Sequence, residues 1–182
     1  MLRHHKLAGW PLLLVAVALF AFGCNSSTDD PDVANSQLSV TAFNPSEACV
    51  DWDGTEVDTN GDGTLDGTAY VGTTQVVNFQ SIVRGSSPDS PWNDVVLTEC
   101  EVSYRMDYGF PPPPRRFGVQ VAIPANGTGA IGLTTVDPND IPAFFGPGDQ
   151  GTVILKFYGE DASGQPATAV GSTRLLTATE CK

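Results

Sequence analysis

Oxygen-bearing side chains recur at alternate positions in one short segment, residues 58–66, whose sequence is Asp-Thr-Asn-Gly-Asp-Gly-Thr-Leu-Asp. The candidate ligands all offer an oxygen: Asp58, Asn60, Asp62, Thr64 (through its backbone carbonyl) and Asp66. Hard cations prefer such donor sets, and Ca²⁺, which takes about 6–8 oxygens in flexible geometry, suits the spacing better than Mg²⁺. The segment therefore predicts a calcium site, with an Asp/Gly-rich turn that binds no ion as the alternative.

Two neighbours of the ligands have structural tasks in this interpretation. Gly63 permits the sharp turn at the sixth position, and Leu65 is expected to point inward and anchor the loop. Asp51, Asp53 and Glu56 precede the loop and could add ligands or nearby negative charge, which only a cation would neutralise.

The segment resembles the EF-hand loop only in its first half, because position 12 is Ala69 and not glutamate. It is more similar to the shorter DxDxDGxxD loops between strands of integrin-type propellers, thrombospondin-type repeats and many exported bacterial proteins. That resemblance makes Asp66 the last protein ligand and implies a structural calcium ion within an insertion at about residues 51–69.

Paired carboxylates such as Asp51 and Asp53 also allow a second interpretation, the acid and base of a hydrolase that cleaves an envelope polymer or glycan. Their spacing does not separate that role from calcium ligation. The only histidines are His4 and His5, so a chain cut before Cys24 would lack the commonest general acid/base. We therefore expect a protein that is not an enzyme.

The N-terminus has the features of an export signal. Arg3 and Lys6 precede an uncharged apolar run, residues 10–22, and a polar segment begins directly after Gly23 and Cys24. The run is shorter than the roughly 20 residues that cross a bilayer as a helix. We expect residues 1–23 to be a signal peptide and residues 24–37 a polar, flexible tether.

Residues 21–24, Ala-Phe-Gly-Cys, resemble the lipobox of bacterial lipoproteins, although leucine is usual where Ala21 stands. The resemblance implies lipidation of Cys24, cleavage just before it, and attachment to the cell-envelope membrane. Asn25 differs from the Asp that retains such proteins in the inner membrane, which favours the outer membrane. An ordinary secretory signal cut nearby, or an uncleaved anchor, is the alternative.

Charge limits the partners. Without the signal, seven basic residues remain against 21 acidic ones, a formal charge of −14. Such a field repels nucleic acid and anionic lipid and favours cations. We therefore expect no nucleic-acid partner.

The remainder, residues 38–182, has the composition and patterning of a β domain. Runs rich in β-branched and aromatic residues are separated by Gly, Pro, Asn and Asp, which predicts about seven strands. The predicted strands are residues 38–43, 74–83, 95–104, 117–123, 129–135, 152–158 and 169–176. A change of alternation within the third predicts a bulge near Thr98 and Glu99, and residues 142–145 could form one helical turn at most.

Strand number and spacing resemble an immunoglobulin-like or fibronectin-III-like sandwich, with a barrel as the alternative. The run 153–164 is similar to the penultimate strand and turn of such domains in exported bacterial proteins. In that fold the first strand often runs parallel to the last, which implies a Cys49–Cys181 disulfide, while Cys100 would face the core.

Three lesser features complete the sequence-based expectations. Residues 110–114, Phe-Pro-Pro-Pro-Pro, predict a stiff connection between strands, and Arg115 and Arg116 after it could meet the acidic loop or a partner. Trp52, Trp92 and Tyr108 could form a sugar-stacking platform, with ordinary packing as the favoured alternative. Together these features favour a membrane-anchored, calcium-stabilised binding or structural module with an envelope protein or glycan as partner.

Overall fold

The computed structural model describes residues 36–84 and 90–178. The chain divides into two compact units, Met1–Pro31 and Asp32–Lys182, and all described residues belong to the second. The signal peptide, Cys24 and Cys181 lie outside the described residues. Within the described part, no helix has the length and apolar character needed to cross a bilayer.

The described residues form ten strands and two single-turn helices. The strands are β1 (Ser36–Asn44), β2 (Glu47–Asp51), β3 (Thr55–Val57), β4 (Gly67–Ala69), β5 (Thr73–Val83), β6 (Val95–Met106), β7 (Arg115–Ile123), β8 (Thr128–Val136), β9 (Gln150–Asp161) and β10 (Pro166–Ala178). The 3₁₀-helix η1 (Pro91–Asn93) precedes β6, and α2 (Ile141–Phe144) follows β8.

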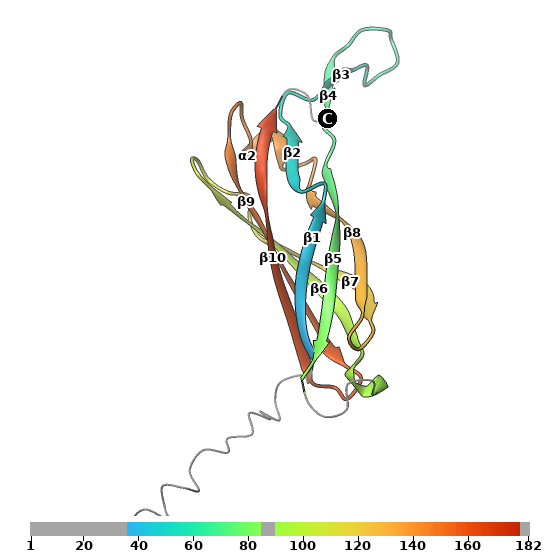
Figure 1. Ribbon diagram of the computed structural model, residues 1–182. Coiled ribbons are helices and arrows are strands. Elements are labelled where there is room, and N and C mark those ends of the chain that lie inside the picture. Colours follow the sequence, from blue (N-terminus) through green and yellow to red (C-terminus); the bar gives the residue numbers. More distant parts are fainter. Residues whose placement is uncertain (1–35, 85–89, 179–182) are drawn as a thin grey trace, which may run out of the picture. The chain divides into compact units, whose positions relative to one another are not determined.

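Two sheets pack face to face (Figure 1). One has the order β1-β5-β8 and the other the order β2-β10-β9-β6-β7, while β3 and β4 pair only with each other. All pairings are antiparallel except that of β2 with β10, which is parallel. The chain is thus an all-β, immunoglobulin-like sandwich, as the sequence predicts, and not a closed barrel.

Alternation along the strands builds the core between the sheets. In β5 every second residue is buried, including Val77 and Phe79, and in β9 the buried set includes Leu155 and Phe157. Phe79 and Phe157 meet edge to face with ring centroids 4.8 Å apart, which joins the two sheets by a favoured aromatic geometry. The apolar face of each strand therefore fixes its register.

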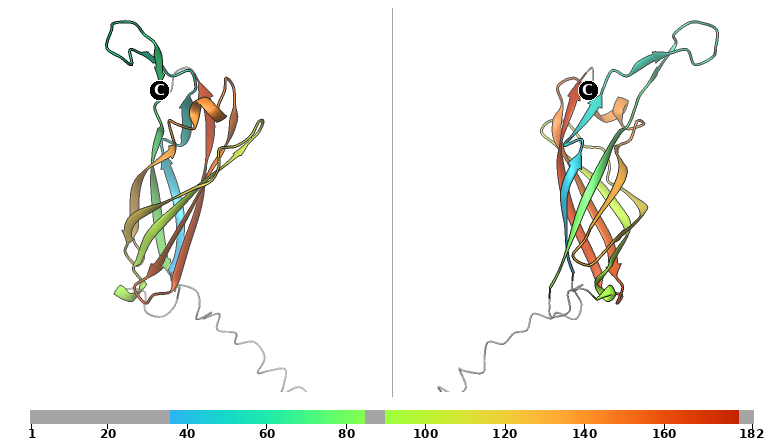
Figure 2. Two further views of the ribbon diagram at one scale, coloured as in Figure 1. Left: turned by 180° about the vertical axis from the view of Figure 1, so that it is seen from behind. Right: turned by 45° about the vertical axis from the view of Figure 1, so that its right-hand side comes forward.

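Strand directions define two ends of the sandwich. Ser36 is the register partner of Val83, so β1 begins and β5 ends at the same end, which we call the near end. At the opposite end, which we call the far end, Gln150 pairs with Leu176, and Cys49 of β2 pairs with the same Leu176. The β3–β4 hairpin extends from the far end (Figure 2).

The seven predicted strands are all present, each extended by one to three residues at one or both ends. The predicted bulge is confirmed, because the register of β6 with both neighbours shifts between Leu97 and Glu99. The structure adds β2, β3 and β4, and β1 begins at Ser36, inside the segment assigned to the tether. The helical turn at residues 141–144 and the strand connection at residues 107–114 also match the expectation.

Candidate functional site

The candidate calcium loop is the tip of the β3–β4 hairpin. Register pairs Thr55↔Ala69 and Val57↔Gly67 place the base and the tip, and the Asp66 N–H donates to the Val57 carbonyl at 3.1 Å to close the loop. Only three residues of each strand pair, and most of them are exposed. Isolated two-stranded hairpins are marginal in water, so the tip depends on its own polar contacts.

Those contacts form a series of turns in which side-chain oxygens accept backbone N–H groups. Asp58 Oδ1 accepts from the Gly61 N–H at 2.6 Å, and its Oδ2 accepts from the Gly63 N–H at 2.7 Å. Asn60 Oδ1 accepts from the Asp62 N–H at 2.9 Å, and Asp62 Oδ1 from the Thr64 N–H at 2.8 Å. Asx-type turns of this kind orient successive oxygens around a small loop.

The last predicted ligand joins the two sides of the loop. Asp66 Oδ1 accepts from the Thr59 N–H at 2.8 Å and from the Thr59 hydroxyl at 2.7 Å. Asp66 Oδ2 accepts from Asn60 Nδ2 at 3.0 Å. Gly61 and Gly63 both have positive φ, 81° and 87°, which explains why glycine stands at these positions of a loop this tight.

Hydrogen bonding keeps the three loop carboxylates ionised. The pKa of Asp58 is lowered chiefly by the Gly63 backbone N–H, that of Asp62 by the Thr64 N–H, and that of Asp66 by the Thr59 N–H. Three ionised carboxylates therefore share one exposed loop. Such a concentration of negative charge on a hydrogen-bonded frame has the chemistry of a hard-cation site.

The carboxylates do not converge on one point in this arrangement. Among the residues that the structure describes, no three His, Cys, Asp or Glu side chains are grouped closely enough to hold a metal. The donor set itself fits calcium, since it consists of oxygens alone, and each carboxylate oxygen that accepts one hydrogen bond retains a second lone pair. Binding would require Asp66 and the Asn60 amide to turn inward from their mutual contact.

Four neighbouring residues do not complete the site. Leu65 is 60% exposed and does not plug the loop, because no core lies beneath the projecting hairpin. Asp51 and Asp53 precede β3 and lie at the base of the hairpin, with Glu56 inside β3, whereas the predicted ligands lie at the tip. A hydrogen bond shared with Asp51 raises the pKa of Asp53, so these two carboxyls form a pair of their own.

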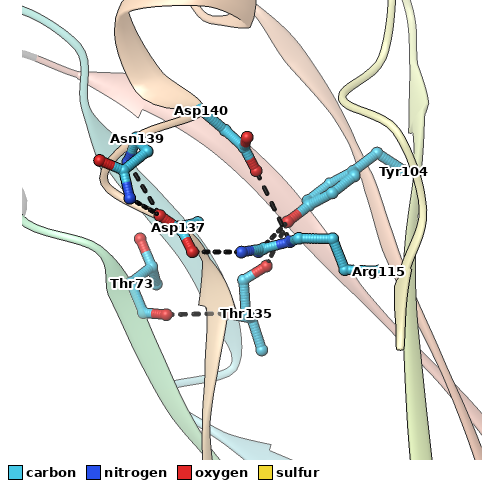
Figure 3. Close-up of polar contacts among 7 residues, drawn as sticks. All are labelled: Thr73, Tyr104, Arg115, Thr135, Asp137, Asn139 and Asp140. Carbon is cyan, nitrogen blue, oxygen red and sulfur yellow. Dashed lines mark hydrogen bonds and ion pairs between the residues drawn. The ribbon is translucent and has the colours of Figure 1, made fainter. Parts of the chain in front are cut away.

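A second polar cluster, which the sequence analysis does not predict, ties together the far end of the sandwich (Figure 3). Arg115, at the start of β7, pairs with Asp137, which directly follows β8, and lies 3.6 Å from Asp140 Oδ2 through its Nε. Arg115 Nη2 also donates to the Tyr104 hydroxyl at 3.2 Å. β7 and β8 are edge strands of different sheets, so the cluster links the two sheets along one open side.

Tyr104 connects this cluster to a local irregularity in β8. The register of β5 with β8 passes from Thr74↔Thr134 to Thr73↔Val136, which leaves Thr135 without a register partner. The Tyr104 hydroxyl donates to the Thr135 carbonyl at 2.7 Å, and the Thr135 hydroxyl donates to the Thr73 carbonyl at 3.2 Å. The Tyr104 side chain thus provides a hydrogen bond to the Thr135 carbonyl, which lies at the irregularity in the β5–β8 pairing.

The charges in this cluster depend on one another. The hydrogen bond from the Asn139 N–H lowers the pKa of Asp137, and Arg115 lowers it further. Burial raises the pKa of Asp140, against the effect of Arg115. The two carboxylates neutralise Arg115, which corrects the expectation that this arginine could meet the acidic loop.

The second arginine is also neutralised within the domain. Arg116 pairs with Glu99 at 3.1 Å and Glu101 at 2.8 Å, and its guanidinium lies 4.7 Å from the centre of the Tyr158 ring. A shallow hollow of about 580 Å³ adjoins both arginines, with Phe117 and Leu133 among its apolar lining. Because each arginine already has acidic partners, this hollow offers no free positive charge to an anionic ligand.

Trp92 lies at the opposite end of the sandwich from Trp52 and Tyr108, so the three aromatics do not form one sugar platform. Trp92 belongs to η1 directly before β6, and Tyr108 follows the opposite end of the same strand, so the length of β6 separates them. Trp52 follows β2 at the far end. The twelve residues of β6 span about 40 Å at strand rise, too far for one sugar to touch both.

The cysteines have different surroundings. Cys100 is a free thiol with no exposed surface, and burial raises its pKa to about 12. The parallel pairing of β2 with β10 places Cys49 opposite Leu176, five residues before Cys181. Since Cys181 is outside the described residues, the Cys49–Cys181 disulfide stays a prediction.

Sequence comparison adds no relatives to this account. No known family model matches the chain, and no curated protein matches its sequence at a significant level. The class of the protein therefore rests on its own fold, an immunoglobulin-like sandwich with an acidic loop on a projecting hairpin.

Proposed function

We propose that this protein is a lipid-anchored envelope protein that acts as a non-catalytic binding or structural module, with calcium ordering its β3–β4 hairpin. The observation that carries the proposal is the loop at residues 58–66, in which five predicted oxygen ligands share a hydrogen-bonded frame held by two positive-φ glycines. The anchor at Cys24 rests on the sequence resemblance alone.

Calcium has a physical task in this proposal. Asp58, Asp62 and Asp66 repel one another in a hairpin that has three register pairs and no core beneath it. A divalent cation would neutralise that repulsion and cross-link the two sides of the loop. Modules outside the cytoplasm commonly bind calcium with dissociation constants of about 10⁻⁴–10⁻³ M, which suits a structural ion.

The far end is the proposed binding end. Tyr108 and Phe110, on the connection between β6 and β7, are 81% and 87% exposed, and Leu65 and Val71 of the hairpin region are also exposed. Prolines 111–114 stiffen that connection, which reduces the entropy lost when it docks. An envelope protein or glycan could contact these side chains.

A thermal melt tests the calcium component. EDTA is expected to lower the melting temperature of the full chain, and millimolar calcium, but not the same ionic strength of sodium, to restore it. Asp62→Asn should abolish this response, whereas Asp107→Asn, which removes a negative charge outside the loop, should retain it. Identical melting curves with EDTA and with calcium would refute a structural ion.

Fractionation tests the anchor. The wild-type chain is expected in the membrane fraction with a mass increase on its N-terminal peptide, and Cys24→Ser is expected in the soluble fraction. A wild-type N-terminal peptide that begins at Cys24 and carries no added mass would contradict lipid anchoring at this residue.

A further inference from the structure

We infer that the near end of the sandwich docks on the lipid surface itself, with the Trp92 side chain inserted at the membrane–water interface. This inference rests on the proposed anchor at Cys24. It goes beyond that anchor, because it assigns an orientation and a second membrane contact to the folded domain.

Trp92 is unusual for a large side chain beside a packed core. It is 65% exposed, although its neighbour Asn93 in the same turn is buried. The single turn η1 carries no acidic residue in its first turn and no basic residue in its last. Indole rings prefer the headgroup level of a bilayer, where an apolar body and one N–H are both satisfied.

The position of Trp92 relative to the start of the domain supports the choice of lipid as the occupant. The Ser36 hydroxyl donates to the Asn93 carbonyl at 2.7 Å, so the chain enters the sandwich directly beside η1. Ser36 lies twelve positions after Cys24, and a segment of that length spans at most about 40 Å when extended and about 20 Å on average as a coil. A membrane holding Cys24 is therefore within reach of Trp92.

Two further side chains give the near end an interfacial character. Ile82 is 50% exposed, and its register partner is Gln37, the second residue of β1. Arg84 is exposed and donates to the Gln37 side chain at 2.8 Å, which places a cation beside the Ile82–Gln37 pair. An exposed Trp, an exposed Ile and an Arg at one end of the domain match the composition of membrane–water interfaces.

Two acidic side chains that the structure describes at this end accept backbone hydrogen bonds. Asp94 accepts the Ala125 N–H at 2.8 Å, and the buried Asp161 accepts from Ser163 and Gln165 in its own turn. Glu160 remains exposed. Because the whole chain is strongly acidic, the expected surface is zwitterionic phosphatidylcholine or phosphatidylethanolamine, and not anionic lipid.

Tryptophan fluorescence of the lipidated full chain in phosphatidylcholine vesicles tests the inference. After signal removal the chain has two tryptophans, Trp52 at the far end and Trp92 at the near end, so each serves as the control for the other. Trp52→Phe reports Trp92 alone, Trp92→Phe reports Trp52 alone, and the wild type minus Trp92→Phe gives the Trp92 signal without altering Trp52. Vesicles with and without brominated lipid are compared, after flotation has verified membrane attachment.

The expected result is at least a twofold loss of Trp92 emission with brominated lipid, together with a blue shift, and no change for Trp52. Chains that float while Trp92 is quenched no more than Trp52 would overturn this inference and leave the anchor intact. A blue shift without quenching would also overturn it, because a second protein copy would then cover Trp92. Chains that fail to float would overturn both the anchor and this inference.

Discussion

Replacing Tyr104 by phenylalanine removes one oxygen from the cluster that links the two sheets. That oxygen donates to the Thr135 carbonyl at 2.7 Å and accepts from Arg115 Nη2 at 3.2 Å. Thr135 is fully buried and has no register partner in β5. No strand-pairing hydrogen bond can therefore replace the bond that its carbonyl accepts from Tyr104. The ring itself, which packs edge to face on Phe145 at 6.2 Å, is unchanged.

The expected cost follows from these contacts. A buried acceptor left without its donor destabilises a fold by about 1–3 kcal/mol. Arg115 adds little to that cost, because it is 28% exposed and retains Asp137. A loss of about 2 kcal/mol corresponds to a drop in melting temperature of about 4–8 °C for a domain near 150 residues.

Urea unfolding monitored by fluorescence measures this cost. Tyr104→Phe should lower the midpoint at an unchanged slope, and Tyr108→Phe should differ from the wild type by less than about 0.5 kcal/mol, because Tyr108 is 81% exposed. A Tyr104→Phe variant as stable as the Tyr108→Phe control would refute the argument that side chains satisfy the irregular stretch of β8.

Further predictions concern the acidic loop, the core thiol and one glycine contact. The folded pKa values of the loop aspartates are lowered, so the stabilisation from their ionised forms is present above the unfolded pKa and is lost as pH falls through the folded pKa. Carboxyl NMR titration should give a pKa for each of the three below the ordinary aspartate value of 3.8, and pKa values at or above 3.8 would contradict this. Cys100 should resist alkylation at pH 8 in the native chain and react on unfolding, and rapid native labelling would show that its burial is wrong. Gly159→Ala should destabilise the fold by about 1–3 kcal/mol, because its Cβ would lie 2.1 Å from the Val96 carbonyl oxygen, while Gly132→Ala, which meets nothing within 4 Å, serves as control; equal stability of the two variants in urea would refute that contact.

The strands were predictable because alternation directly reports a buried face. β-branched and aromatic residues predicted β5 and β9, in which the structure buries residues at alternate positions. A change of alternation near Thr98 predicted the bulge of β6. β2 was missed because its five residues, Glu-Ala-Cys-Val-Asp, are few and bear charges at both ends. β3 and β4 were missed because three-residue strands have no periodicity to detect.

The site was predictable only in part, for a related reason. Local spacing defines a loop, so residues 58–66 could be assigned to a turn from the sequence, and the structure gives that turn a hydrogen-bonded frame. The link between Arg115 and Asp137 joins positions 22 residues apart, and only the meeting of two sheet edges brings them together. Their local signals were the basic pair after the prolines and the Asp-Pro-Asn-Asp turn, but neither identified the other.

The prediction that Leu65 points inward was wrong, because it assumed an apolar core beneath the loop. An inward-pointing residue requires a core to enter, and the hairpin extends beyond the two sheets (Figures 1 and 2). The loop therefore lacks the apolar anchor of an EF-hand, which increases its dependence on hydrogen bonds and on a bound ion.

Isothermal titration of the full chain with calcium tests the central proposal most directly. The expected result is one ion per chain with a dissociation constant of about 10⁻⁴–10⁻³ M, weakened at least tenfold in the double variant Asp58→Asn, Asp66→Asn and unchanged in Asp107→Asn. No measurable binding at millimolar calcium, or equal affinity in the loop variant and its control, would contradict a calcium site at the tip of the β3–β4 hairpin.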